Sequence, residues 1–200
     1  MAAGWAPAVA EVPFDMTAKM VFLDRDGVLV RNVVRDGRYL APRQLAEFSL
    51  YHNAGAAVAE LRAAGWQVAV VTNQPDLGNG LMDWSTLDRM HQMLTAQIGI
   101  TGIFICPHRQ EEGCACRKPA PGLLLQAAAA LGLEIADLVD CWMVGDRASD
   151  IVAGQAVGCR TIMIDHGTGD SAGGCPDLVV DSLSAAIEAI LSTGDTRGAL

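Results

Sequence analysis

Two acidic side chains follow a short apolar run near the start of the chain. Asp24 and Asp26 come directly after residues 20–23, and Gly27 lets the backbone turn at once, so both carboxylates can point at one site. One carboxylate can attack an electrophile, while the other donates a proton and later takes one from water. Because crowded carboxylates repel each other, a hard cation such as Mg²⁺ is the usual remedy. The pair therefore predicts nucleophilic and acid–base chemistry beside a metal ion, although an isolated Asp-x-Asp-Gly is more often a turn.

Three further side chains complete a set suited to phosphoryl transfer. Thr72 offers a hydroxyl donor, Lys118 a positive charge, and Asp146 another oxygen ligand for Mg²⁺. A trigonal phosphoryl group needs such partners around its equatorial oxygens, since its transfer is catalysed mainly by positioning and electrostatics. The segments that carry these residues and the Asp24–Asp26 pair each follow one of the strands predicted below. This shared placement favours a common site over the interpretation as isolated turns.

Hydrophobic periodicity indicates the elements that must position these residues. Short apolar runs rich in β-branched residues alternate with Ala- and Leu-rich stretches of helical period, the pattern of an α/β fold with a parallel sheet. We expect strands at 20–23, 67–72, 102–106, 141–144, 160–164 and 178–180. We expect helices at 54–64, 85–98, 123–131, 150–157 and 183–191. Sheets of this kind bind ligands at the carboxyl ends of their strands, where the polar residues above lie.

A second constellation gathers cysteine and histidine. Cys106, His108, Cys114 and Cys116 place three thiols and one imidazole within eleven positions, a set that suits tetrahedral Zn²⁺. A closed set of four ligands leaves no position for water, so we expect a structural zinc that fixes the loop running into Lys118. The alternative is free buried cysteines beside a surface histidine. The scattered cysteines are expected to be small apolar fillers: Cys141, Cys159 and Cys175.

Composition bounds the class of protein. The chain has 200 residues, 51% of them hydrophobic, and a formal net charge of −9. That length allows one compact domain, which we expect at 19–191 with its zinc loop at 106–116, between a flexible leader at 1–18 and a flexible tail at 192–200. The acidic balance argues against nucleic-acid or anionic-membrane partners, which need clustered Lys and Arg. Because no targeting or membrane-spanning segment is recognisable, we expect a cytoplasmic protein. We also expect it to be a monomer.

Four segments resemble the motifs of a known family. They are VFLDRDGV at 21–28, VTNQ at 71–74, CRKP at 116–119 and VGDR at 144–147. Together they are similar to the haloacid dehalogenase-like phosphatases, in the branch of D-glycero-D-manno-heptose 1,7-bisphosphate 7-phosphatases and histidinol-phosphate phosphatases. The resemblance covers about residues 19–165 and implies a Rossmann-like three-layer α/β/α fold.

The resemblance implies a Mg²⁺-dependent phosphatase that works through an aspartyl phosphate. It makes Asp24 the nucleophile and Asp26 the general acid and then base, with Thr72 and Lys118 holding the phosphoryl group. The implied Mg²⁺ ligands are Asp24, the main-chain carbonyl of Asp26, and Asp146, and a zinc on the 106–116 loop of the branch matches the four Cys and His residues. The implied substrate-binding residues are Arg25, Asn73, Gln74 and Arg117. Asp150 is expected either to orient metal-bound water or Lys118, or to cap the following helix.

The expected substrate is a small phosphorylated metabolite. The gaps between motifs leave no room for a folded cap domain, so loops must form the roof of the pocket. Basic residues gather in one segment, as a second substrate phosphate would require, unless they form a solvated face: Arg31, Arg35, Arg38 and Arg43. They favour a sugar bisphosphate, whereas the short spacer between His108 and Cys114 resembles histidinol-phosphate phosphatases. Pro75 stands where the heptose enzymes usually carry Ser, which removes one hydroxyl and one backbone donor.

Two binding modules compete with an enzyme. A phospho-receiver signalling module also combines aspartates, Thr and Lys on a parallel sheet, but its phosphorylated Asp follows the third strand, whereas here the Asp pair follows the first. A zinc-ribbon nucleic-acid module is disfavoured by the charge of −9 and by the lack of basic residues interleaved with aromatics. We therefore predict a phosphatase acting on heptose bisphosphate, with histidinol phosphate as the alternative substrate.

Overall fold

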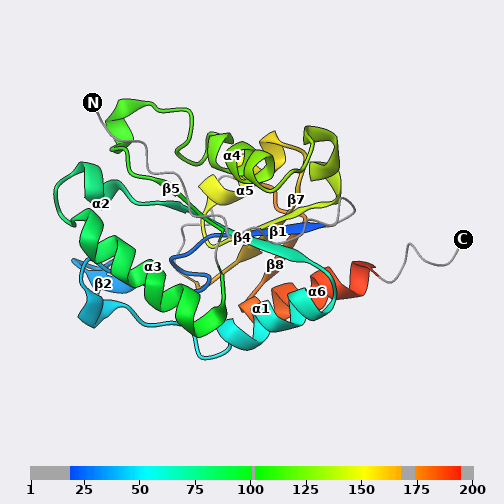
Figure 1. Cartoon of the computed structure of the whole chain (residues 1–200), viewed down its shortest axis with the longest axis horizontal. Coiled ribbons are helices and arrows are strands. Elements are labelled where there is room, and N and C mark those ends of the chain that lie inside the picture. The colour runs from blue at the N-terminus through cyan, green and yellow to red at the C-terminus, as the bar shows by residue number, and fades with distance from the viewer. Residues whose placement is uncertain (1–18, 101, 168–173, 195–200) are drawn as a thin grey trace, which may run out of the picture.

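A six-stranded parallel sheet forms the centre of the protein in the computed structural model, which describes residues 19–100, 102–167 and 174–194 (Figure 1). Its strands are β1 (Met20–Leu23), β4 (Gln67–Asn73), β5 (Ile103–Cys106), β6 (Trp142–Gly145), β7 (Arg160–Ile164) and β8 (Leu178–Val180). They lie in the order β5-β4-β1-β6-β7-β8, with every neighbouring pair parallel. The α/β class expected from the sequence is confirmed.

The position of β1 in the sheet decides where a ligand can bind. Phe22 lies opposite Ala69 of β4 on one side and opposite Met143 of β6 on the other. From β1 the chain builds outward to β5, then returns to β6 and continues to β8. The connections on the two sides of this point lead in opposite directions, which opens a crevice at the carboxyl ends of the strands.

Helices cover both faces of the sheet (Figure 1). The helices on one face are α1 (Ala54–Ala63), α3 (Trp84–Ile98) and α6 (Leu183–Gly194), and those on the other are α4 (Gly122–Ala130) and α5 (Ala148–Ala156). Successive residues of β1 face opposite layers, because strand side chains alternate. Val21 belongs to the buried core that includes Leu61 and Leu87, and Phe22 to the core that includes Leu123.

The ends of α3 follow from local sequence. Asp83 is its N-cap, and the carboxylate accepts a hydrogen bond from the backbone N–H of Thr86 at 2.7 Å. The helix ends at Gly99, which takes the left-handed conformation with φ of 71°. These two signals fix the ends of a fifteen-residue helix, which packs against α1.

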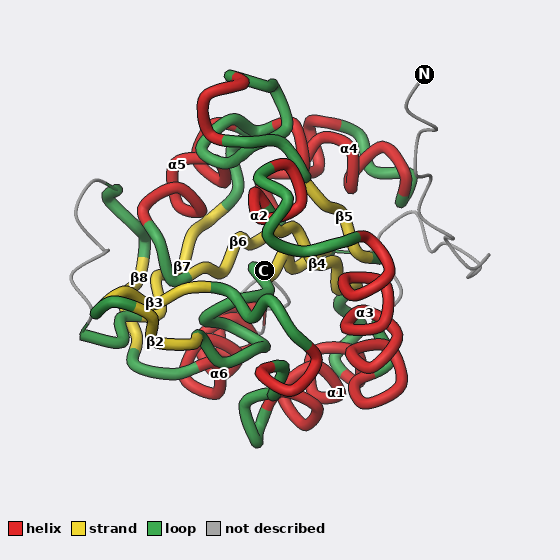
Figure 2. The backbone as a smooth tube through the Cα atoms, turned by 90° about the vertical axis from the view of Figure 1, so that its left-hand side faces the viewer, coloured by secondary structure: helices red, strands yellow, loops and turns green. Residues whose placement is uncertain are grey.

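Further short elements lie outside the set expected from the sequence. A hairpin is formed by β2 (Val33–Arg35) and β3 (Arg38–Leu40), and α2 (Pro75–Gly78) follows β4. Figure 2 faces the edge of the sheet near which the hairpin and α2 lie. Short 3₁₀ helices occur at Leu45–Glu47, Gln110–Glu112 and Ile135–Asp140. The hairpin and α2 therefore provide the loops over the strand ends, as the absence of room for a cap domain predicts.

The ends of the expected domain differ from the structure in one place. α6 continues to Gly194, past the expected end of the domain at 191. The hydroxyls of Ser192 and Thr193 donate to the carbonyls of Ala189 and Ile190 within this last turn. The flexibility of the tail stays a prediction. The expected leader at 1–18 and the rest of the tail, 195–200, lie outside the described residues.

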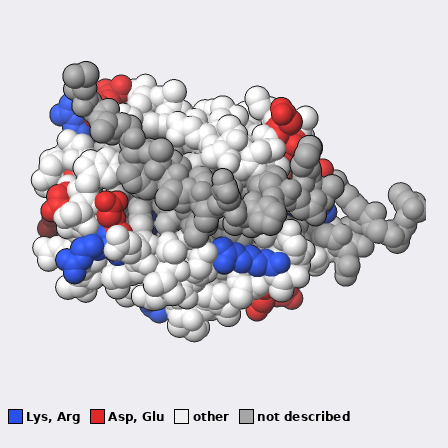
Figure 3. All heavy atoms as spheres, viewed as in Figure 1, with Lys and Arg blue, Asp and Glu red and all other residues white. Residues whose placement is uncertain are grey.

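Surface properties bear on the expected partners. Over residues 19–100, 102–167 and 174–194, no helix has the length and apolar character needed to cross a membrane. On the face shown in Figure 3, the described Lys and Arg atoms lie apart from one another, with Asp and Glu between them. The cytoplasmic location, the monomeric state and the lack of nucleic-acid partners stay predictions.

Candidate active site

The carboxyl end of β1 brings Asp24 into a pocket of about 550 Å³. Lys118 also lines this pocket, and its Nζ donates to Asp24 Oδ1 at 2.6 Å and to the Val71 carbonyl at 2.7 Å. Asp150 Oδ1 lies 2.6 Å from the same ammonium group. Burial alone would lower the pKa of Lys118, but the carboxylates of Asp150 and Asp24 raise it above its usual value. The lysine is therefore a fixed positive charge between two acids.

Three buried carboxylates converge beside this ammonium group. Asp24, Asp146 and Asp150 each place an oxygen within 4.8 Å of the others. Burial, and then the charges of Asp24 and Asp150, raises the pKa of Asp146 to about 8. Asp146 Oδ2 accepts a hydrogen bond from Asn32 at 3.2 Å, whereas Oδ1 is buried with no partner among the described residues. A hard divalent cation fits this set, because it binds carboxylate oxygens and relieves their repulsion.

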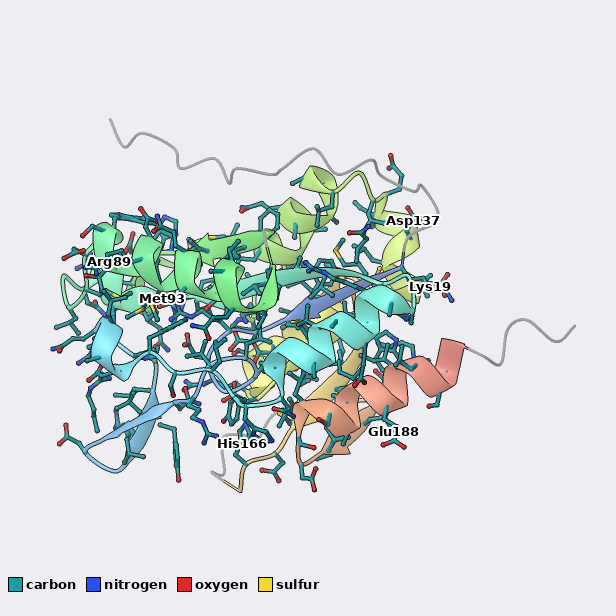
Figure 4. All side chains as sticks on the ribbon, turned by 60° about the horizontal axis from the view of Figure 1, so that its bottom comes forward. Lys19, Arg89, Met93, Asp137, His166 and Glu188 are labelled. Atoms are coloured by element: carbon teal, nitrogen blue, oxygen red, sulfur yellow. The ribbon has the colours of Figure 1, made fainter. Side chains whose placement is uncertain are left out.

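The turn after Asp26 is built for close approach to these carboxylates. Gly27 has φ of 91°, and a Cβ there would lie 2.0 Å from Asp146 Oδ2. Only glycine fits this position, so the main chain beside Asp26 can approach Asp146, as metal binding by the Asp26 carbonyl requires. The Nε2 of His166 (labelled in Figure 4) lies 2.7 Å from the Gly27 carbonyl, and its ring stacks on Tyr51.

Asp26 lines the pocket and is held by two donors. Arg25 Nη2 donates to Asp26 Oδ2 at 2.9 Å, and Gln74 Nε2 donates to the same oxygen at 2.7 Å. Burial raises the pKa of Asp26, the Arg25 charge lowers it and the Asp24 charge raises it, and the net result lies above the usual range. A carboxyl group with a raised pKa is suited to donate a proton and take one back.

Arg25 lies away from the pocket that the other expected substrate-binding residues line. Its side chain is fully buried and is engaged by Asp26 and His91, so nothing in the described residues supports the expected substrate contact, which stays a prediction. The physical reason for this placement is the alternation of side chains along an extended segment: Asp24 and Asp26 point into the pocket, and Arg25 points away from it.

The end of β4 fixes the loop that carries the lysine. Asn73 Nδ2 donates to the Lys118 carbonyl at 3.0 Å, and the Lys118 N–H donates to Asn73 Oδ1 at 3.1 Å. Asn73 and Gln74 line the pocket as expected of substrate-binding residues. Thr72 is buried and accepts a hydrogen bond from Gln74 at 2.9 Å without lining the pocket. A direct contact from Thr72 to a phosphoryl group stays a prediction.

The structure brings the four expected zinc ligands together. Cys116 Sγ lies 3.3 Å from His108 Nδ1 and 3.4 Å from Cys114 Sγ, and Cys106 Sγ lies 3.6 Å from each of the same two atoms. Ligands 2.3 Å from a tetrahedral Zn²⁺ lie about 3.8 Å apart, so these separations suit one ion at the centre. No disulfide forms among the six cysteines, all of which lie in the described residues.

Glycines attach this loop to its surroundings. A Cβ at Gly122, the first residue of α4, would lie 2.3 Å from the Ala115 carbonyl, and one at Gly78 would lie 2.7 Å from the Pro107 carbonyl. The N–H groups of both glycines donate to these same carbonyls at 3.1 Å. The Cys/His loop is therefore packed between α2 and α4, directly before Lys118.

The arginines of the segment expected to bind a second phosphate lie in different surroundings. Arg43 lines the pocket, where its Nε lies 2.8 Å from Asp76 Oδ2. Arg35 instead forms an ion pair with Glu47, and Arg31 lies over the Tyr51 ring, 5.0 Å from its centroid. Of the four arginines singled out in this segment, only Arg43 lines the pocket.

Two arginines from other segments complete the basic rim. Arg117 lines the pocket, and its Nη1 is buried without a partner in the described part of the chain. Arg147 also lines the pocket, and its Nη2 donates to the Tyr39 carbonyl of the hairpin at 2.9 Å. An unpaired buried guanidinium nitrogen is costly unless a ligand pairs with it, so Arg117 is suited to an anionic substrate group.

The site lies at the carboxyl ends of parallel strands. It combines an aspartate pair, a buried lysine and further carboxylates, and this combination is that of a phosphoryl-transferring hydrolase. Comparison with known proteins agrees with this class. A family model described as HAD-hyrolase-like matches residues 115–186. The D-glycero-beta-D-manno-heptose-1,7-bisphosphate 7-phosphatase of Pseudomonas aeruginosa is 35% identical over 185 residues, which cover 88% of this chain and 99% of that protein. The chain belongs to the haloacid dehalogenase-like (HAD-like) hydrolase family and is a phosphatase.

Two further relatives extend this comparison. The D-glycero-alpha-D-manno-heptose-1,7-bisphosphate 7-phosphatase of Mycobacterium tuberculosis is 36% identical over 189 residues, covering 89% of this chain and 93% of that protein. The crystal structure of D,D-heptose 1,7-bisphosphate phosphatase from Bordetella bronchiseptica, complexed with magnesium and phosphate, superposes with a TM-score of 0.75 at 34% identity. It covers 88% of this chain and 99% of its own. The resemblance drawn from the four motifs is confirmed.

Proposed function

We propose that the protein removes the 7-phosphate of D-glycero-D-manno-heptose 1,7-bisphosphate, leaving the sugar 1-phosphate. The observation that carries this proposal is the pocket in which Asp24 and Asp26 lie beside Lys118, with Arg117 and Arg43 on the rim. Asp24, Asp26 and Lys118 suit phosphoryl transfer, and the two arginines suit a second phosphate group on the substrate. Relatives 35–38% identical to this chain carry the name of this activity.

Asp24 is the nucleophile in this mechanism. Lys118 holds Oδ1, so Oδ2 attacks phosphorus, and a new Oδ2–P bond forms as the bond from phosphorus to the sugar oxygen breaks. Asp26 gives its proton to the leaving sugar oxygen. It then takes a proton from water, whose oxygen attacks phosphorus. The Oδ2–P bond breaks, and inorganic phosphate leaves with Asp24 restored.

The carboxylate cluster would hold Mg²⁺ through Asp24, Asp146 and the main-chain carbonyl of Asp26. Support comes from the unpaired Asp146 Oδ1, the close approach at Gly27, and the magnesium in the Bordetella relative's crystal structure. When bound, the ion neutralises the carboxylates and the charge on the phosphoryl oxygens. Asp150 joins Lys118 directly, and its Oδ2 accepts from the Arg147 N–H at 3.0 Å, so it combines both roles expected for it.

Zinc removal tests the second metal. We expect about one zinc per chain by elemental analysis, and we expect Cys116→Ser to lose it and to lower both the melting temperature and the turnover, because the loop delivers Lys118. Cys175→Ser is the matched control, since this exposed cysteine lies outside the cluster and should keep the metal. Metal-free protein that melts at the same temperature as the metal-loaded protein would contradict the structural role.

The substrate test compares kcat/KM for both anomers of heptose 1,7-bisphosphate with that for histidinol phosphate. We expect a preference for a bisphosphate anomer of about tenfold or more, because one charge-assisted contact contributes about 1.5–3 kcal/mol. Arg117→Gln should reduce this preference by raising KM for the bisphosphate, with a smaller effect on the monophosphate. A preference for histidinol phosphate would reverse the assignment, although the phosphatase chemistry would stand.

A further inference from the structure

Arg25 occupies a fully buried position behind the active site. Its guanidinium uses Nε and Nη2 on Asp26, and its Nη1 lies 3.0 Å from His91 Nε2. The Phe48 ring lies 6.0 Å from its Cζ. A buried guanidinium needs hydrogen-bond acceptors for its N–H donors. Asp26 accepts from Nε and Nη2, and His91 is the acceptor for Nη1.

His91 comes from α3, between the labelled Arg89 and Met93 of Figure 4, and the mechanism above gives it no role. Burial, and then the charge of Arg25, lowers the pKa of His91 to about 3, so its ring is neutral. A neutral ring that accepts from Arg25 at Nε2 carries its proton on Nδ1. That Nδ1 is buried without a partner among the described residues. An apolar residue would avoid this unpaired group, so the acceptor at Nε2 is the property that distinguishes histidine here.

We propose that His91 is a positioning residue: it accepts a hydrogen bond from Arg25, holds the guanidinium against Asp26, and so aims the Asp26 carboxyl group at the leaving oxygen. This inference rests on the proposed acid and base role of Asp26. Gln74 reaches the same carboxylate from the pocket side at 2.7 Å. Asp26 is thus fixed between two donors, one of which is anchored by His91.

The position of His91 predicts which kinetic constant changes. His91 does not line the pocket, whereas the groups that would bind phosphate, Lys118 and Arg117, do. Loss of the acceptor leaves Nη1 of Arg25 unpaired and lets the guanidinium turn away from Asp26. A displacement of about 1 Å in a reacting group can cost about 10²-fold in rate, so kcat should fall while KM stays constant.

The test compares His91→Leu with His91→Gln by steady-state kinetics on heptose bisphosphate. We expect His91→Leu to lower kcat by about tenfold or more at unchanged KM, and His91→Gln, whose amide oxygen can accept from Arg25, to recover most of the loss. The deficit should be larger for an alkyl phosphate than for p-nitrophenyl phosphate under single-turnover conditions, because nitrophenolate leaves without a proton. His52→Leu, an exposed histidine, is the matched control and should retain wild-type kinetics.

Three outcomes would overturn the proposal. One is a His91→Leu enzyme with a lower melting temperature but wild-type kcat, which indicates packing alone. Another is an equal loss in the Leu and Gln variants, and the third is a deficit independent of the leaving group. If His91→Leu does not fold, His91→Asn replaces it, because the shorter amide falls short of Arg25. Failure of the proposed function looks different, since wild-type enzyme would then not turn over the bisphosphate.

Discussion

Asp24→Asn should reduce phosphatase turnover by about 10⁴-fold or more while preserving the fold, because it removes the attacking oxygen and little else. The amide has nearly the same size as the carboxylate and keeps an oxygen that can accept from Lys118. Asp150 remains to pair with the lysine, so the buried ammonium group is not left alone. The measurements are kcat, the far-ultraviolet circular dichroism spectrum, and the mass of the protein trapped during turnover.

The mass of the protein trapped during turnover distinguishes the role of Asp24 from that of Asp26. Wild-type enzyme should show an added phosphoryl group at Asp24, and Asp24→Asn should show none. Asp26→Asn is the matched control, since it removes the acid and base from the same pocket but keeps the nucleophile; we expect a loss of about 10²–10⁴-fold. Turnover near the wild-type rate in Asp24→Asn, or a phosphoryl adduct on it, would refute the mechanism.

The sequence predicted the sheet well for a specific physical reason. β1 and β6 are buried along their whole length, so their residues form unbroken apolar runs that polar residues end abruptly. Asp24 and Asp146 follow those runs directly, and parallel strands bring their carboxyl ends to one edge. The convergence of these acids could therefore be predicted without knowledge of any distance.

The hairpin was missed although a local signal was present. Asp36 and Gly37 form the two-residue turn between β2 and β3, and both have positive φ, 50° and 72°. Asp-Gly is a preferred pair for such turns, and β-branched and aromatic residues flank it. The interpretation of this segment as a substrate site rested on its charge, whereas the hairpin brings the Tyr39 carbonyl to Arg147.

The contact between Arg25 and His91 had no comparable signal. The two residues are 66 positions apart, and their meeting depends on how α3 packs against the β1 turn. Strand alternation predicts that Arg25 points away from Asp24 and Asp26, but the side chain that receives it belongs to another layer. Similarly, Asn32 and Asp146 are 114 positions apart, and only the folding of the chain brings them into contact.

Lys118→Met should cost stability as well as activity. Lys118 is buried between Asp24 and Asp150, and removing one partner of a buried ion pair costs about 3–5 kcal/mol because the remaining charges are uncompensated. We also expect kcat to fall by about 10²–10³-fold, the usual effect of removing one group that stabilises transition-state charge. Urea unfolding in metal-free buffer measures the first effect, and steady-state kinetics with Mg²⁺ measures the second.

The other lysine of the chain, Lys19, provides the control for this prediction. Lys19 (labelled in Figure 4) precedes β1 at the opposite end of the strand from Asp24, with its Nζ 5.7 Å from the Trp66 ring centroid. Lys19→Met should change stability by only about 0.5–1 kcal/mol and leave turnover unchanged.

Mg²⁺ should then stabilise Lys118→Met more than it stabilises the wild type. Without the ammonium group the carboxylates bind the cation more tightly, and a ligand that binds only the folded state adds stability that grows with its affinity. Equal stabilisation of both proteins by Mg²⁺, or a Lys118→Met variant as stable and active as Lys19→Met, would show that the lysine does not balance this carboxylate cluster.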